Sequence, residues 1–449
     1  MLEQELADSD SEDDAINALT PAPAEASDAW DARPGRKRLR TGAVAAESCP
    51  PHPGFMHGMC IRCGAVLEDD EATGLALRYI HSGLRLSTAE AERVRQRSMR
   101  RVMDSGKLLL VLDLDHTLLN STRLTDVCDE AGTLLDALLE REARAGAPPS
   151  LHRLAHLNLW TKLRPGVRAF LEAVARHFEL HIYTHGDADY ARAMAALLDP
   201  GGRLFAERVI SQADSQQQHV KDLGVVLGAE AAAVIVDDTA AVWPQHAANL
   251  LLVERYIFFP ACAERFGSTQ RALLDEGRDE DPARGMLAAA LRVLLEVHAG
   301  VFAAREGDPA RDARVALAAA RRRVLAGVRL CFSAVIPRGA ASPQAHALWR
   351  LAEELGAQVA DAPDEATTHV VSARDRTDKV LWARQHARFA VSTLWLHSCG
   401  VLWCKPDEQD FPVAEQRPLQ LAPVRSEAQD LAAAMAGAGG GRGWASKPL

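Results

Sequence analysis

Two carboxylates and a threonine, Asp113, Asp115 and Thr117, directly follow an uninterrupted apolar run, 108–112. A run of this length is typical of a strand buried on both faces of a parallel sheet. Open α/β sheets place their ligand crevice at the carboxyl ends of such strands. Alternate side chains of an extended chain point to the same side, so Asp113 and Asp115 can share one small target. The alternative is a polar turn whose acids are merely solvated.

Helices and strands alternate along the chain after this stretch. We predict helices over 167–177 and 188–198, and strands over 180–183, 208–211 and 234–236. Strands that alternate with helices form parallel sheets, so the expected fold class is α/β.

Polar residues also stand at the ends of the later strands. Thr184 ends one strand, Asp237 and Asp238 end another, and Lys221 lies between them in the chain. Taken singly, Lys221 could be a surface lysine and Thr184 a plain strand-end hydroxyl. The order D-x-D-x-T, T, K, DD resembles the haloacid dehalogenase superfamily of phosphotransferases. More narrowly, DLDHTL, KLRPGV, HIYTHGDADYA, LLDP, HVKDL and VDDTAAVWPQH resemble the phosphatases of the RNA polymerase II C-terminal repeat domain.

The resemblance implies a Rossmann-like parallel sheet and a phosphatase active site. A carboxylate can attack a phosphate ester and leave again, so Asp113 is assigned as the nucleophile. Asp115 would protonate the leaving oxygen and then deprotonate the water. Lys221 would neutralise the phosphoryl oxygens, and Thr184 would donate a hydrogen bond to one of them.

A cation is expected at this site because a carboxylate must approach a phosphate dianion. Mg²⁺ prefers hard oxygen ligands, which Asp113, the backbone carbonyl of Asp115, and Asp237 or Asp238 would supply. Thr117, Arg164, Asp199 and Trp243 are the expected substrate-binding residues. Asp199 could equally be a turn residue before Pro200, and Trp243 plain core.

A cysteine and histidine cluster precedes the catalytic-looking segment. Cys49 and His52 form C-x-x-H, and Cys60 and Cys63 form C-x-x-C. Two such pairs suit tetrahedral zinc, and free thiols packed under a helix are the alternative. A helix is expected over 82–104, with a capping box from Ser87 to Glu90 at its start.

The C-terminal third forms a second α/β unit. The series LAGVRLCFS, ELGAQV, TTHVVSA, RTDKVLWA and VSTLWLHSC resembles a BRCT domain, with Trp395 in its core. Such domains often bind phosphopeptides. Ser333, Thr377 and Lys379 match their phosphate pocket, where a helix N-terminus and a lysine would hold the anion; the alternative is a domain that only packs against partners.

These segments give the expected domain organisation. It comprises a disordered tail (1–48), a Cys/His knuckle (49–74), a catalytic domain (75–265) with an insertion or lid (121–158), a helical linker or cap (266–323), a BRCT domain (324–415) and a flexible tail (416–449).

Composition and charge exclude some classes of function and indicate a cellular compartment. The net charge of −10 argues against direct nucleic-acid binding. We expect no membrane span, because no apolar run approaches the required length, and reduced thiols rather than disulfides among the eight cysteines. The basic segment 33–40 has the texture of a nuclear import signal, with an ordinary solvated basic tail as its alternative.

Together these features predict a nuclear, Mg²⁺-dependent protein Ser/Thr phosphatase of the polymerase II C-terminal repeats. Its BRCT domain would bind a phosphoprotein or transcription-factor partner. A non-catalytic transcription scaffold that binds phosphoproteins is the alternative, and a phosphatase of small metabolites is a third.

Overall fold

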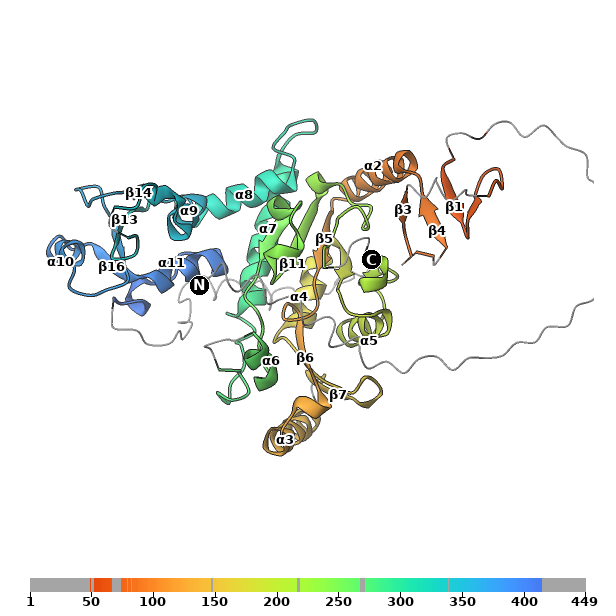
Figure 1. Ribbon diagram of the computed structural model, residues 1–449, viewed down its shortest axis with the longest axis horizontal. Helices are drawn as coiled ribbons and strands as arrows, with labels where there is room; N and C mark the ends of the chain where they lie inside the picture. Colours follow the sequence, from red (N-terminus) through yellow and green to blue (C-terminus); the bar gives the residue numbers. More distant parts are fainter. Residues whose placement is uncertain are drawn as a thin grey trace, which may run out of the picture.

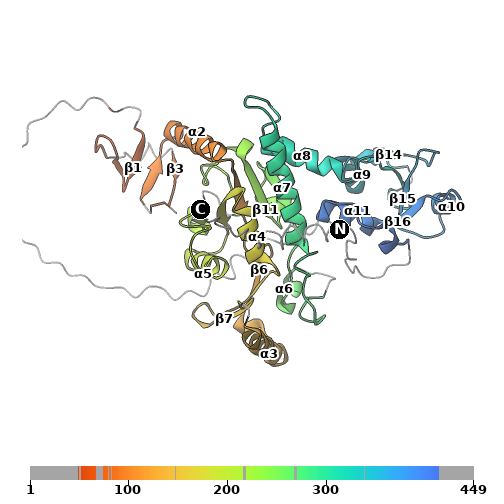
Figure 2. The same ribbon diagram turned by 180° about the vertical axis from the view of Figure 1, so that it is seen from behind.

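The computed structural model describes residue 49 and residues 52–66 and 74–413, except 79, 82, 147, 216–218, 267–270 and 338. The predicted tails 1–48 and 416–449, with the basic segment 33–40, lie outside the described residues. Figures 1 and 2 show a central sheet with a small N-terminal sheet at one end of the molecule and a C-terminal α/β unit at the other.

The central sheet has five parallel strands in the order β10-β9-β5-β11-β12. Its middle strand β5 is Leu108–Leu112, and all five of its residues are buried. The other strands are β9 (Phe178–Tyr183), β10 (Val209–Ile210), β11 (Ala233–Asp237) and β12 (Leu250–Leu252). The predicted α/β fold class with a parallel sheet is therefore confirmed.

Each face of β5 packs against a different layer. Leu108, Leu110 and Leu112 belong to the large core cluster, which includes side chains of α4 (Val167–Val174), α5 (Ala188–Leu198), α7 (Met286–Ala303) and α8 (Ala313–Arg323). Leu109 and Val111 face the opposite side, where they pack with Val102 of α2 (Thr88–Asp104) and with the loop 223–226. Helix or loop thus covers both faces of the sheet, which explains why β5 is apolar throughout.

Helix α7 corrects the expectation that no apolar run approaches a membrane span. It is long and apolar enough to cross a membrane by length and composition alone, and within the described residues no other helix passes that test. However, nine of its residues are buried in the protein core, and it contacts α4 and α8. The segment predicted as a helical linker or cap therefore contributes to the core beneath the central sheet.

After β5 the chain leaves the sheet and forms a separate unit in the region of the segment 121–158, the expected insertion. Three antiparallel strands pair in the order β6-β8-β7: Leu119–Arg123, Leu159–Leu163 and Leu151–Leu154. Helix α3 (Asp129–Ala145) joins β6 to β7, and its Leu135 packs with Trp160 and Phe258. Figure 1 shows this unit projecting from the central sheet, with α3 farthest away.

The N-terminal unit is a four-stranded antiparallel sheet in the order β2-β1-β4-β3. Its strands are β1 (Gly54–Met56), β2 (Met59–Cys60), β3 (Leu75–Ala76) and β4 (Leu84–Leu86). The predicted helix over 82–104 is wrong at its start, because β4 occupies its first turn. The helix α2 begins at Thr88, where the Ser87 side chain accepts a hydrogen bond from the Glu90 N–H at 3.3 Å.

The C-terminal unit is a four-stranded parallel sheet in the order β14-β13-β15-β16, which confirms the predicted small α/β domain. The strands are β13 (Arg329–Ser333), β14 (Gln358–Ala360), β15 (His369–Ser372) and β16 (Phe389–Ser392). Three helices flank them: α9 (Ala347–Glu354), α10 (Asp378–Gln385) and α11 (Thr393–Leu402). Trp395 is fully buried in the core, as expected. Arg292 of α7 ties this unit to the core around the central sheet by donating to the carbonyls of Leu402 and Trp403.

Candidate active site

Predicted site residues lie at the carboxyl ends of three adjacent strands. Asp113 follows β5 and donates its backbone N–H to the carbonyl of Val236 in β11. Thr184 follows β9, and Asp237 is the last residue of β11. Because these strands are parallel neighbours, their ends meet at the same edge of the sheet.

Lys221 lies between two of the carboxylates. Its Nζ donates to Asp113 Oδ1 at 2.6 Å and to Asp237 Oδ2 at 2.8 Å. The rings of Tyr183 and Trp243 lie 5.8 and 5.9 Å from the same nitrogen and add cation–π contacts. The side chain is only 2% exposed, so it is neither a surface lysine nor free to move.

Burial and charge set the protonation of this group of residues. Burial alone would lower the pKa of Lys221, but Asp113 and Asp237 raise it above its ordinary value, so the ammonium persists. Burial, opposed by Lys221, raises the pKa of Asp113 well above its usual range, and neighbouring carboxylates add to this. Burial and Asp237 raise the pKa of Asp238 to about 6. Lys221 and Arg255 together do not balance the four acids Asp113, Asp115, Asp237 and Asp238, which favours the binding of another cation.

The same acids form a plausible cation site. Carboxylate oxygens of Asp113, Asp237 and Asp238 all lie within 4.8 Å of one another. Asp237 Oδ1 accepts the Thr239 N–H at 2.8 Å, and Asp238 Oδ2 accepts from Arg255 at 2.7 Å. Such hard oxygen donors, held in place by hydrogen bonds, fit Mg²⁺.

Asp115 lies against different partners from Asp113. The Tyr190 hydroxyl donates to Asp115 Oδ1, and the Thr184 hydroxyl donates to Asp115 Oδ2 at 3.4 Å. Burial and the Asp115 charge raise the pKa of Tyr190 well above its usual range, so the phenol remains a donor. The two acids separated by one residue therefore have distinct surroundings: Asp113 faces Lys221, and Asp115 faces two hydroxyls.

Arg164 does not lie where a substrate-binding residue would be expected. Its side chain is fully buried and forms a two-point ion pair with Glu280 at 2.7 and 3.0 Å. It also donates to the carbonyls of Thr117 and Glu254, both at 3.0 Å. Arg164 therefore braces the loop that follows Asp113 and Asp115.

Three other predicted substrate-binding residues are also buried. Asp199 Oδ2 accepts the N–H groups of Leu204 and Phe205, so it stabilises the turn after α5. The indole of Trp243 donates to Asp237 Oδ2 at 2.8 Å and thus orients that acid. Thr117 is completely buried, and its hydroxyl finds no partner among the described residues. Thr117, Asp199 and Trp243 therefore belong to the framework that supports the site. For Asp199 and Trp243 this agrees with the alternatives of a turn residue and a core tryptophan.

Sequence reasoning missed three residues that the structure brings to the site. Tyr190 contacts Asp115, Arg255 pairs with Asp238, and Glu280 pairs with Arg164. Tyr190 lies inside the motif HIYTHGDADYA, which offered a signal for it. Arg255 and Glu280 lie outside every one of these motifs, so only the fold reveals them.

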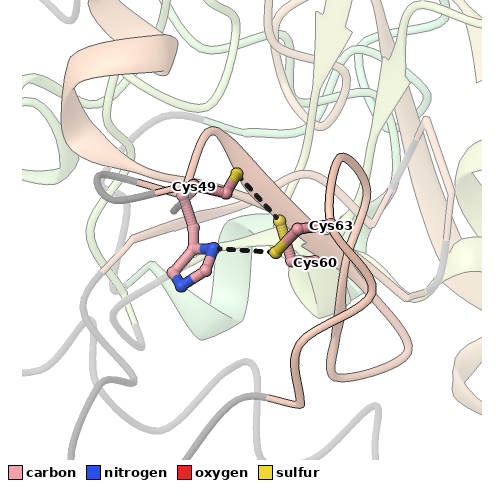
Figure 3. Close-up of side chains that lie close together, drawn as sticks. Cys49, Cys60 and Cys63 are labelled. Atoms are coloured by element: carbon pink, nitrogen blue, oxygen red, sulfur yellow. Dashed lines mark hydrogen bonds between the residues drawn. The ribbon is translucent and has the colours of Figure 1, made fainter. Parts of the chain in front are cut away.

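Two further predicted clusters assemble away from the active site. Cys49, His52, Cys60 and Cys63 come together beside β1 and β2. Figure 3 shows the three cysteines pointing toward one another.

The second cluster lies at the end of β13. Ser333 Oγ lies 2.8 Å from Thr377 Oγ1, and Thr377 caps the N-terminus of α10. Lys379 Nζ donates to the carbonyls of Phe332 at 2.9 Å and Asp361 at 2.5 Å. The three residues predicted as a phosphate pocket are thus neighbours.

Several known proteins are similar to this chain. Residues 108–266 match the family described as NLI interacting factor-like phosphatase. The RNA polymerase II C-terminal domain phosphatase-like 4 of Arabidopsis thaliana is 41% identical over 372 residues, which cover 82% of this chain and 83% of that protein. The phosphatase-like 3 protein of the same plant is also 41% identical, over 72% of this chain but only 27% of its own length.

A solved structure has a similar fold. The structure of Fcp1, described as an essential RNA polymerase II CTD phosphatase, aligns with a TM-score of 0.53 and 24% identity. The alignment covers 72% of this chain and all of that one.

Proposed function

The chain belongs to the family of RNA polymerase II C-terminal domain phosphatases and is a protein phosphatase, and we propose that it hydrolyses phosphoserine or phosphothreonine in the heptad repeats of RNA polymerase II. The observation that carries this proposal is Lys221, whose Nζ lies between Asp113 and Asp237 at the carboxyl edge of the sheet. A buried ammonium beside a carboxylate nucleophile is what the attack on a phosphate dianion requires.

In the first step, Asp113 attacks phosphorus and forms an acyl phosphate while the bond to the serine or threonine oxygen breaks. Asp115 donates a proton to that departing oxygen. Tyr190 and Thr184 orient Asp115 for this transfer through their hydrogen bonds to its two oxygens. Lys221 compensates the negative charge that the phosphoryl group brings to Asp113.

In the second step, Asp115 takes a proton from water, and the water oxygen attacks phosphorus. The bond between phosphorus and the Asp113 oxygen breaks, which releases inorganic phosphate and restores the carboxylate. Mg²⁺, when bound, would neutralise charge on the phosphoryl oxygens. Asp113, Asp237 and Asp238 are the side chains that would hold it, with the backbone carbonyl of Asp115 as the further ligand that we expect.

The C-terminal α/β unit would bind a phosphorylated partner through Ser333, Thr377 and Lys379. Its attachment to the catalytic core would raise the local concentration of a repetitive phosphorylated substrate. Because RNA polymerase II is the proposed target, we propose that the protein acts in the nucleus.

The test is hydrolysis of a phosphorylated heptad-repeat peptide by the full chain. We expect Mg²⁺-dependent phosphate release that EDTA abolishes and excess Mg²⁺ restores. Asp113→Asn should reduce release to background, whereas Asp136→Asn, which changes an exposed acid on α3, should leave it unchanged. Turnover by Asp113→Asn would contradict the covalent mechanism. Wild-type activity on small phosphate esters but not on the peptide would contradict the proposed substrate.

A further inference from the structure

We propose that Cys49, His52, Cys60 and Cys63 bind one Zn²⁺ ion that holds the N-terminal sheet in its fold. One ligand atom from each of the four residues lies within 4.8 Å of all the others. This set of three sulfurs and one imidazole nitrogen is typical of structural zinc, whereas Mg²⁺ prefers oxygen. The proposed ion is thus different in kind and in place from the cation expected at Asp113.

The distances within the cluster fit a tetrahedron around zinc. With Zn–S of about 2.3 Å and Zn–N of about 2.0 Å, two sulfurs lie about 3.8 Å apart, and a sulfur and a nitrogen about 3.5 Å apart. The observed separations are 3.9 Å between the sulfurs of Cys49 and Cys60, and 3.5 Å between Cys63 Sγ and His52 Nδ1. Figure 3 marks both pairs with dashed lines.

The backbone around the second pair forms a tight turn that presents both sulfurs. The Arg62 N–H points to Cys60 Sγ at 3.4 Å, which suits an anionic sulfur acceptor. The Gly64 N–H donates to the Cys60 carbonyl at 2.9 Å, and Gly64 adopts a left-handed φ of 73° that closes the turn. The chain thus returns to pair Met59 with Val66.

The surroundings argue against the alternative of free thiols packed under a helix. Cys63 is exposed, and its sulfur faces the His52 ring rather than an apolar helix face. A buried thiol would behave as a small hydrophobic side chain, but this sulfur has a polar nitrogen as its neighbour.

The N-terminal sheet is too small to rely on its own core. Its buried cluster contains only Leu77, Leu86, Ala91 and Leu227 among the described residues. Ala91 lies on α2, and Leu227 lies in the loop before β11. Four larger apolar side chains of the unit remain about half exposed or more: Met59, Ile61, Val66 and Ile80. Units with so little buried apolar surface usually need a metal or disulfides to fold.

The N-terminal sheet also contacts the region beside the proposed active site. Arg78 follows β3 and donates to the Ala213 carbonyl at 3.2 Å. The same side chain lines a cavity with Gln212 and with His185 and Asp187, which closely follow Thr184 in the chain. A zinc ion that orders the sheet would therefore also fix one wall of this cavity.

The test is the metal content of the full chain purified without chelators, measured by elemental mass spectrometry. We expect one Zn²⁺ per chain, retained in the presence of excess Mg²⁺. Cys63→Ser should weaken Zn²⁺ binding by at least about 100-fold, since the loss of an outer contact alone can cost that much. Cys128→Ser is the matched control, because Cys128 is an equally exposed cysteine on the insertion.

A second measurement does not depend on how well a variant folds. Replacement of zinc by Co²⁺ in the wild-type chain should give intense visible bands of a tetrahedral site and thiolate-to-cobalt charge-transfer bands. Three outcomes would overturn the zinc site: a zinc-free wild type, a cobalt spectrum without tetrahedral and thiolate charge-transfer bands, or a Cys49–Cys60 disulfide found by mass spectrometry under reducing purification.

Discussion

The hydroxyl of Tyr190 donates a hydrogen bond to Oδ1 of Asp115, the carboxylate two residues after the proposed nucleophile. Ser121 Oγ lies 3.1 Å from the same phenol and 2.9 Å from Thr161 Oγ1. A line of hydroxyl groups thus runs from the insertion sheet through α5 to the proposed acid. This contact gives α5 and the insertion a direct influence on the position of Asp115.

Tyr190→Phe should lower kcat by about 10-fold and leave KM nearly unchanged. The substitution removes one hydrogen bond to a charged group, which is worth about 1.5–3 kcal/mol, and keeps the ring in the core. Tyr256→Phe is the matched control, because its hydroxyl donates to Asp279 instead. A positioning role also requires that Tyr190→Phe have little further effect in an Asp115→Asn background. Equal losses in both tyrosine variants would contradict it.

Arg164→Lys should destabilise the protein by about 2–4 kcal/mol rather than raise KM selectively. Lysine cannot form the two-point pair with Glu280 and also reach the carbonyls of Thr117 and Glu254. Denaturant unfolding and steady-state kinetics on the same samples separate the two effects. Glu280→Gln should show a loss in the same direction. A raised KM at unchanged stability would restore the substrate-binding role predicted from the sequence.

The strands that carry the site were predictable because they are fully buried. The runs 108–112 and 234–236 are apolar on both faces, and acids follow each of them at once. Their unbroken apolar sequence therefore marks both the strand and its carboxyl end. Strand β12 is not predictable because three residues give no periodicity, and β4 is predicted as helix because α2 begins only two residues after it.

The roles of the supporting residues could not be derived in the same way. Arg164 lies in a motif, and a motif does not tell whether an arginine faces the cleft or the loop behind it. Its partner Glu280 is 116 residues away, and Arg255 lies 17 residues after Asp238. Such pairs are fixed by how the segment after β12 folds back onto the loop after β5, where the Tyr256 N–H donates to the His116 carbonyl.

Acidification should destabilise the protein partly through His185. Burial, with the nearby charge of Lys221, lowers the pKa of His185 to about 4, and its Nε2 is buried without a partner in the described part of the chain. The charged and titratable groups around it are Lys221, Asp237, His219, Arg78 and Asp187. Below pH about 6.5 the unfolded chain binds a proton that the folded chain excludes, so stability falls as pH falls toward 4.

Denaturant unfolding at pH 7, 6 and 5 measures this effect. Protonation of His185 changes the free energy of unfolding by at most about 1.4 kcal/mol per pH unit. Because the His185 side chain is partly exposed, we expect a change of about 1 kcal/mol or less per pH unit. His185→Gln should have a flatter dependence of unfolding free energy on pH than the wild type. His156→Gln, which alters an exposed histidine, should keep the wild-type slope. Parallel curves for wild type and His185→Gln would contradict the role of His185.

Lys379→Met should weaken binding of a phosphorylated heptad-repeat peptide to the C-terminal unit by about 10-fold. Lys379 Nζ lies beside the carbonyl of Phe332, next to the hydroxyls of Ser333 and Thr377 at the N-terminus of α10. A phosphate there would gain a charge-assisted hydrogen bond and the partial positive charge of the helix end. Binding is measured with the full-length Asp113→Asn chain, which should not hydrolyse the peptide, and thermal unfolding checks that the fold persists. Lys405→Met, in the same unit but paired with Glu408, should bind like the parent. Equal affinity for phosphorylated and unphosphorylated peptides would instead show that this surface only packs against protein partners.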